Sequence, residues 1–330
     1  MSAVGRRSVL LAVLLVIVLS QGLAIAAEPS YDDLRKAYDY DHNAALNTEM
    51  GGELTANGQF VRIVFSSLND ERVPAVIALP NSAQHGDGPY PAVVFGHGLG
   101  GSKDDPGYRM AASVIVQAGY AVIMIDYPFH GERAPKEGPT LSDPANLSPE
   151  DAGKLLDLMV KGATQTVLDQ RRAIDFLCTR PELDKARIGY AGLSLGAILG
   201  SVLAGVEDRL ACAALVVGGA DWGKILSTSV LTSAARTAGA FDPAAAAEKL
   251  QGADPKYFAP HIGCPTLLLF GGKDTVVPYD PCGKLLSELV SGDKTVHVYE
   301  NSGHGLEGQG DQFDAVGRLL AFFKERLHGK

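Results

Sequence analysis

The feature that most constrains the fold is the pentapeptide Gly192-Leu193-Ser194-Leu195-Gly196, read together with its flanks. The residues before it, 186–191, predict a short apolar strand, and residues 197–204 after it predict a small-residue helix. In a chain with 38 glycines such a pentapeptide can occur by chance, so the strand and helix predicted on either side of it are the stronger evidence. A serine at such a turn sits on a strained backbone with its hydroxyl above the sheet. The pattern therefore predicts an acyl-transfer hydrolase with Ser194 as nucleophile.

Composition is that of an ordinary globular protein. The chain has 330 residues, of which 46% are hydrophobic and 20% charged. This length suits one large domain or two small ones. Short apolar runs alternate with helical stretches to the end of the sequence, which favours a single domain over residues 28–330.

Residues 1–27 have the features of a signal peptide. Arg6 and Arg7 precede an apolar run over residues 9–19, which is too short to span a bilayer comfortably. The segment 24–26 then offers a small-residue cleavage site. We therefore expect a secreted or periplasmic protein without stable membrane insertion after cleavage, an uncleaved membrane anchor being the alternative.

The chain is acidic, with a net charge of −9. Residues 1–27 contain two arginines and no acidic residue, so their removal leaves −11. This charge argues against nucleic acid or an anionic membrane surface as partner. A small-molecule ester remains the expected partner.

The four cysteines do not have the spacing of a metal cluster. Cys178 and Cys212 fall in apolar elements, where we expect buried thiols. In an exported protein a disulfide between Cys264 and Cys282 is possible, although we favour free thiols there.

Alternating apolar runs predict a mostly parallel, twisted sheet of eight strands with helices on both faces. The first two strands should form an antiparallel hairpin. The expected strands cover residues 60–65, 73–79, 91–95, 121–125, 187–191, 212–217, 266–270 and 295–299. The expected helices cover residues 108–118, 164–178, 281–290 and 309–327, besides the one after Ser194.

Two segments interrupt this alternation, residues 131–163 and 221–260. The first carries four prolines and the second is rich in alanine. Both follow the carboxyl ends of strands, where sheets of this kind bind ligands. We interpret them as lid insertions, with plain surface excursions as the alternative.

A serine nucleophile needs a neutral imidazole as base and a carboxylate to orient it. His304 lies between two glycines on the loop after the last strand, where it can reach the serine. Asp274 lies on a glycine-rich turn directly after the strand that ends at Phe270. Asp221 is the second choice for the acid.

The oxyanion donors should be backbone N–H groups. One is expected from Leu195, directly after the nucleophile, and the other from Leu99 in the loop His97-Gly98-Leu99-Gly100-Gly101. His97 and Gly98 are placed beside the substrate on the same loop, with His97 more a loop residue than a base. The mechanism requires no metal and no organic cofactor.

These motifs, in this order, resemble the α/β-hydrolase superfamily. Over residues 60–328 the chain is similar to secreted dienelactone-hydrolase-like esterases and to the catalytic domain of prolyl oligopeptidases. Ser194 stands where dienelactone hydrolases have cysteine, and the propeller domain of the oligopeptidases is missing. The turn Asp126-Tyr127-Pro128-Phe129-His130-Gly131 also resembles a superfamily turn, in which Asp126 and His130 would hold the loop.

The resemblance implies an α/β-hydrolase fold and a serine carboxylesterase that acts through an acyl-enzyme. The acidic first lid favours short to medium uncharged acyl esters. A thioesterase, a lysophospholipase or a small-peptide hydrolase would use the same residues. A binding protein on this fold without catalytic activity is the alternative of another class.

Overall fold

The computed structural model describes residues 28–137, 148–240 and 242–328. The chain divides into two compact units, Met1–Ser30 and Tyr31–Lys330, and every element below belongs to the second. The expected signal peptide, residues 1–27, lies outside the described residues. No helix in the described part of the chain is long and apolar enough to cross a membrane.

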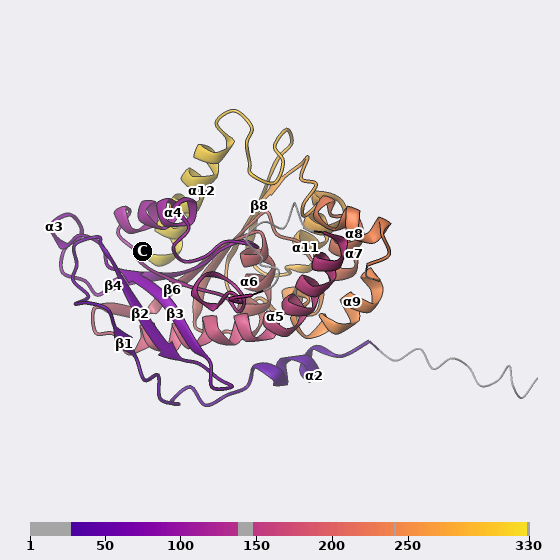
Figure 1. Cartoon of the computed structure of the whole chain (residues 1–330). Helices are drawn as coiled ribbons and strands as arrows, with labels where there is room; N and C mark the ends of the chain where they lie inside the picture. The colour runs from indigo at the N-terminus through magenta and orange to yellow at the C-terminus, as the bar shows by residue number, and fades with distance from the viewer. Residues whose placement is uncertain (1–27, 138–147, 241, 329–330) are drawn as a thin grey trace, which may run out of the picture. The chain divides into compact units, whose positions relative to one another are not determined.

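The described residues form one nine-stranded sheet, in the order β1-β2-β3-β5-β4-β6-β7-β8-β9 (Figure 1). The pairs from β5 through β9 are parallel, which confirms the mostly parallel sheet, and β1, β2 and β3 pair antiparallel. The strands are β1 (Glu49–Met50), β2 (Phe60–Ser66), β3 (Arg72–Ala78), β4 (Tyr90–Gly96), β5 (Ala121–Ile125), β6 (Leu183–Leu193), β7 (Leu210–Val216), β8 (Thr266–Gly271) and β9 (Lys294–Tyr299).

The expected count of eight strands is wrong by one, because it omits β1. This strand has only two residues, and it exists through its pairing with β2. Two residues are too few to produce an alternating pattern in the sequence.

Helices cover both faces of the sheet (Figure 1). On one face, α4 (Pro106–Gln117) and α12 (Asp311–Leu327) pack against Val93 and Phe95 of β4. On the other, α5 (Pro149–Cys178), α6 (Leu195–Val206) and α11 (Lys284–Leu289) share a core with Ala92 and Val94. Successive side chains of a strand point to opposite faces, so each buried strand contributes to both cores.

The segment 131–163 differs from our expectation. Helix α5 begins at Pro149, after Ser148, whose hydroxyl accepts a hydrogen bond from the Asp151 amide, and it continues to Cys178 without a break. Residues 149–163 of the expected insertion are therefore the first half of the long helix α5, because a serine cap followed by proline starts a helix well. Residues 138–147 of the segment lie outside the described part.

The segment 221–260 is a series of short helices. They are α7 (Trp222–Thr228), η4 (Val230–Thr232), α8 (Ser233–Thr237), α9 (Pro243–Lys249), η5 (Gln251–Ala253), α10 (Pro255–Phe258) and η6 (Ala259–His261). The Asp-Pro pairs begin α9 and α10, since the side chains of Asp242 and Asp254 cap them. An aspartate cap followed by proline at the first helical position explains these helix starts.

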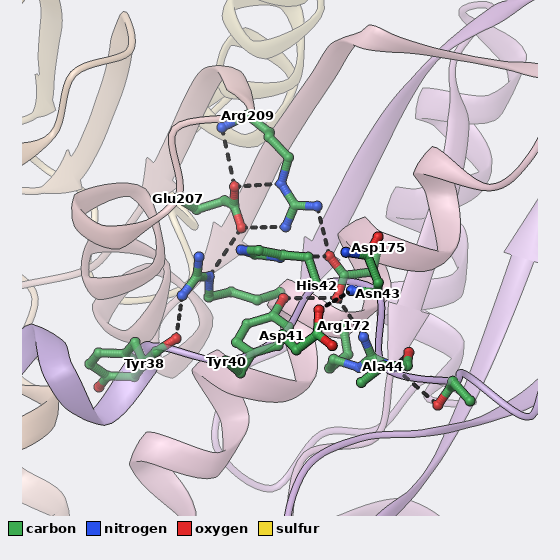
Figure 2. Close-up of polar contacts among 12 residues, drawn as sticks. Tyr38, Tyr40, Asp41, His42, Asn43, Ala44, Arg172, Asp175, Glu207 and Arg209 are labelled. Carbon is green, nitrogen blue, oxygen red and sulfur yellow. Dashed lines mark hydrogen bonds and ion pairs between the residues drawn. The ribbon is translucent and has the colours of Figure 1, made fainter.

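The segment after α2 (Tyr31–Arg35) is fastened by buried charges at the amino end of β7 (Figure 2). The Asp175 carboxylate accepts hydrogen bonds from Tyr40 at 2.9 Å, Arg172 at 2.7 Å and Arg209 at 2.7 Å. Arg172 also donates to the carbonyl oxygen of Ala44 at 2.6 Å. This network lies at the amino ends of the parallel strands, opposite the carboxyl ends where Ser194 lies.

All four cysteines are free thiols, so Cys264 and Cys282 are not bridged. Cys212 and Cys282 are buried. Cys178 is partly exposed rather than buried as expected, because it is the last residue of α5.

Candidate active site

Ser194 lies at the sharp turn between β6 and α6. Its backbone has φ 56° and ψ −117°, and its amide donates to the carbonyl oxygen of Val216 at 2.9 Å. A positive φ is costly for a residue with a side chain and persists only when the surroundings enforce it. The turn directs the Ser194 hydroxyl beyond the carboxyl end of the strand.

The two glycines of the pentapeptide allow this turn to close. A Cβ atom on Gly192 would lie 2.4 Å from the carbonyl oxygen of Gly196. A Cβ atom on Gly196 would lie 2.3 Å from the carbonyl oxygen of Gly96, at the end of β4. Any larger residue at either position would therefore push strand and helix apart.

His304 stands between the other two predicted residues. Its Nε2 lies 2.8 Å from the Ser194 Oγ, and its Nδ1 lies 2.6 Å from the Asp274 Oδ2. Asp274 is buried, and its Oδ1 accepts hydrogen bonds from the amides of Val276 and Val277 at 2.8 and 2.9 Å. The structure thus brings together the three side chains that the sequence nominates.

Neighbouring parallel strands explain how Asp274 and His304 meet. Asp274 follows β8 and His304 follows β9, and these strands are paired along their length. A Cβ atom on Gly271 would lie 2.1 Å from the carbonyl oxygen of Gly303, and the Lys273 amide donates to Ser302 at 2.9 Å. The two loops therefore pack directly on each other.

This arrangement can activate the serine. For Nε2 of His304 to accept the hydroxyl proton, Nδ1 must carry a hydrogen and donate it to Asp274. Asp221, the second choice for the acid, caps α7 through a hydrogen bond from the Lys224 amide at 3.1 Å. Asp274 is consequently the carboxylate that holds His304.

Two backbone amides next to Ser194 are available to a ligand. Among the hydrogen bonds of the described residues, none is donated by the amides of Leu99 or Leu195. Leu195 is the first residue of α6, where N–H groups have no partner within the helix and the helix dipole is positive. A Cβ atom on Gly98 would lie 3.4 Å from the Ser194 Cβ, so the Leu99 loop adjoins the nucleophile.

His97 does not line the site as expected. Its side chain is 1% exposed, and its ring stacks on Tyr127 at a centroid distance of 3.9 Å. Nδ1 lies 2.8 Å from the carbonyl oxygen of Gly98, and Nε2 accepts from the Tyr127 amide at 3.4 Å. Burial, with a contribution from nearby His130, lowers the pKa of His97 to about 3. The ring is therefore neutral and occupied by backbone partners.

A buried lysine ties the same loop to its neighbour, and sequence reasoning missed it. Lys103 is 1% exposed, and its Nζ lies 3.2 Å from Asp126 and 2.7 Å from Glu132. The Asp126 carboxylate also accepts hydrogen bonds from the amides of Lys103 and Glu132, each at 2.9 Å. The sequence identifies Asp126 and its turn as loop-holding residues, but nothing in it marks Lys103 as their partner.

A small apolar cavity of about 20 Å³ adjoins Leu195, and the sequence did not reveal it. Its walls come from the turn after β5, from α5 and from the 221–260 segment. They include Phe129, His130, Met159, Leu195, Trp222 and Leu250. Trp222 is the only tryptophan of the chain, which is the one sequence signal that could have pointed to this cavity.

Within residues 28–137, 148–240 and 242–328, no group of histidine, cysteine and acidic side chains is arranged to hold a metal ion.

Residues 157–330 match the model of the prolyl oligopeptidase family. The Bacillus subtilis protein YtaP is 27% identical over 151 residues, which are 42% of this chain and 46% of its own. The chain aligns with less than half of the length of the curated relatives it matches.

Among solved structures, acetyl xylan esterase 1 from Thermoanaerobacterium sp. is similar, with a TM-score of 0.69 and 19% identity. The alignment covers 91% of this chain and 96% of that one. An acylaminoacyl peptidase of Pyrococcus horikoshii has a TM-score of 0.63 and 17% identity, covering 82% of this chain and 42% of its own. At these identities the likeness concerns the fold, which is that of the α/β-hydrolases.

Proposed function

The chain belongs to the prolyl oligopeptidase family of α/β-hydrolases, and we propose that, as a serine hydrolase of this family, it cleaves carboxylic esters through an acyl-enzyme. The observation that carries the proposal is the position of His304, within hydrogen-bond distance of both Ser194 and Asp274. The bond between Nδ1 and the Asp274 carboxylate leaves Nε2 as the base next to the hydroxyl.

The reaction has two halves. In the first, the Ser194 Oγ attacks the ester carbonyl carbon while Nε2 of His304 takes the hydroxyl proton. The amides of Leu99 and Leu195 donate to the oxyanion of the tetrahedral intermediate. The intermediate collapses, and His304 returns the proton to the departing alcohol.

In the second half, water attacks the acyl-enzyme with His304 again as base. Collapse of the second intermediate releases the carboxylic acid and restores Ser194. The residues alone supply this chemistry, so the mechanism uses no metal and no organic cofactor.

Short acyl groups suit the cavity beside Leu195. A volume of about 20 Å³ accommodates roughly one water molecule or methyl group. Its walls include Met159 of α5 and Trp222 of the 221–260 segment, which fits the interpretation of these segments as lids over the site. The structural likeness to acetyl xylan esterase 1, an enzyme named for an acetyl ester, supports the same preference.

A small-peptide hydrolase is the second candidate. The family match and the likeness to acylaminoacyl peptidase favour it, because the same residues cleave amides. Thioesterase and lysophospholipase activities share this mechanism, whereas a catalytically silent binding protein would not form an acyl-enzyme.

We further propose that residues 1–27 are a signal peptide whose removal leaves one domain, residues 28–330, outside the cytoplasm. Arg6, Arg7 and the apolar run after them support this assignment. Mass spectrometry of the N-terminus from the native host would show a start at or near Glu28.

Hydrolysis of 4-nitrophenyl acetate by the mature protein and its Ser194→Ala variant tests the proposal. We expect activity only with Ser194, and a fluorophosphonate should label the same residue. Circular dichroism confirms that the variant is folded. Activity that survives in folded Ser194→Ala would refute the nucleophile. An inactive wild type that also resists the fluorophosphonate would indicate a silent protein, whereas labelling without ester turnover would favour the peptide or thioester alternatives.

A further inference from the structure

We propose that His97 is a positioning residue that holds the Gly98–Leu99 peptide so that the Leu99 amide faces the oxyanion. The inference rests on the proposed function, because it concerns the same site. In this proposal the His97 side chain acts by holding the backbone carbonyl of Gly98 in a fixed orientation. His97 is buried at 1% exposure and so does not reach a substrate itself.

The carbonyl oxygen of Gly98 has two donors around it. It accepts one hydrogen bond from the Gly101 amide at 3.1 Å and lies 2.8 Å from Nδ1 of His97. In a planar trans peptide the C=O of one residue and the N–H of the next point in opposite directions. Anchoring the Gly98 oxygen on the buried ring therefore turns the Leu99 N–H away from the interior.

The tautomer of His97 follows from its other nitrogen. The Tyr127 amide donates to Nε2, so Nε2 must be the unprotonated nitrogen of a neutral ring. Nδ1 then carries the hydrogen and donates it to Gly98. The two bonds are consistent with each other only in this tautomer, since Nδ1 faces an acceptor and Nε2 faces a donor.

The surroundings keep the ring in place. One face of the His97 ring stacks on Tyr127, and the loop beyond it is tied to Asp126 through the buried Lys103. Gly98 also lies close to the nucleophile, because its Cβ position is 3.4 Å from the Ser194 Cβ. A rotation of the Gly98–Leu99 peptide would thus remove a donor directly at the reacting carbonyl.

Two nearly isosteric variants isolate the hydrogen bond. The amide group of His97→Asn can place a donor close to the position of Nδ1, whereas His97→Leu fills a similar space without one. We expect His97→Leu to lower kcat by about 10²-fold to 10³-fold with KM nearly unchanged, as loss of an oxyanion donor does. His97→Asn should retain kcat within about tenfold.

A trifluoromethyl ketone probes the oxyanion directly, because its adduct with Ser194 carries a negative oxygen in the same place. Its affinity should fall in His97→Leu by about the same factor as kcat/KM. Ile188→Ala serves as the stability control, since Ile188 is a buried residue of β6 whose partner in the sheet, Ala92, lies five residues before His97 in β4. Equal losses of kcat in the control and in His97→Leu would overturn the proposal, as would equal losses in the leucine and asparagine variants.

The tautomer is a readout that does not depend on activity. In ¹⁵N-histidine-labelled Ser194→Ala, long-range ¹⁵N–¹H spectra should show His97 protonated on Nδ1, with the signal assigned by its loss in Ser194→Ala/His97→Asn. A proton on Nε2 would overturn the proposal even if His97→Leu is unstable. Activity that survives in Ser194→Ala would instead refute the proposed function, while the spectra still report on His97.

Discussion

Gly196 faces the carbonyl oxygen of Gly96 so closely that a Cβ atom on Gly196 would lie 2.3 Å from that oxygen. This contact joins the first turn of α6 to the end of β4, and so places the nucleophile beside the loop that carries Leu99. We expect Gly196→Ala to separate the two elements, destabilise the fold by about 1–3 kcal/mol and lower kcat/KM by at least about tenfold. Urea unfolding and ester hydrolysis measure both effects.

Gly317→Ala is the matched control for this change. Gly317 lies exposed within α12, where an added methyl group would have no neighbouring atom within 4 Å and the backbone has no positive φ. Alanine there should raise stability by about 0.5–1 kcal/mol and leave kcat/KM unaltered. Equal behaviour of the two variants would show that the Gly96 contact is unimportant.

Asp274→Asn tests the carboxylate that holds His304. An amide cannot stabilise the imidazolium and permits the wrong tautomer, so kcat should fall by about 10³-fold to 10⁴-fold. Asp221→Asn, at the second choice for the acid, should change kcat by less than about threefold because Asp221 caps α7. A larger loss in Asp221→Asn than in Asp274→Asn would reverse the assignment.

The small volume of the cavity beside Leu195 predicts that it limits the length of the acyl chain of the substrate. Met159→Ala enlarges it and should raise kcat/KM for an octanoate relative to an acetate by at least about tenfold, the lower end of the effect of one methylene group in an apolar pocket. Met110→Ala is the control, because Met110 is 71% exposed on α4. A series of 4-nitrophenyl esters compares the three proteins. An unchanged profile in Met159→Ala would place the acyl chain elsewhere.

Asp175 should be important for stability and unimportant for catalysis. Its removal leaves Arg172 and Arg209 without the carboxylate that both contact at 2.7 Å. Because Asp175 and Arg172 are buried, Asp175→Ala should cost about 3–5 kcal/mol in unfolding free energy. Lys154→Ala, which breaks an exposed pair with Glu150, should leave the unfolding free energy unchanged within error, because water screens such pairs. Equal costs in denaturant titrations would refute the network's role.

The same network predicts a response to acid. Burial disfavours the Glu207 carboxylate, but the hydrogen bonds and charges of Arg209 and Arg171 outweigh it and hold the pKa of Glu207 below its ordinary value. The unfolded chain then takes up this proton at a higher pH than the native state. Stability from Glu207 is therefore complete above the unfolded pKa of about 4.3 and is lost as the pH falls through the lower, native pKa.

Glu207→Gln checks this sign. The variant should be less stable at pH 7, and its unfolding free energy should decline less steeply than that of the wild type between about pH 5 and pH 3. Thermal or urea unfolding at several pH values measures the slope. A steeper decline in the variant would contradict the lowered pKa.

Local patterns predict much of the site. Ser194 is identified because strand, glycines and helix are contiguous in the chain, and His304 because a histidine between glycines follows the last strand. Asp274 and Asp221 both follow strands, and the glycine-rich turn of Asp274 ranks it first in the sequence. The pairing of β8 with β9 agrees with this ranking, since it brings the Asp274 loop onto the His304 loop.

Contacts between distant segments are beyond such patterns. The two residues of β1 are a strand only through their pairing with β2. His97 resembles a residue of the substrate site because it precedes the oxyanion loop. Its burial against Tyr127 turns it inward, and that neighbour comes from the turn after β5.

The sequence by itself determined the fold class and nominated Ser194 as nucleophile and His304 as base, because each inference depends on residues adjacent in the chain and on the regular alternation of strand and helix. Only the tertiary structure brought Asp274 rather than Asp221 to His304, buried His97 away from the site and shaped the cavity beside Leu195. These features arise where separate loops meet at the carboxyl ends of parallel strands, and the strand order that brings those loops together is a property of the folded sheet.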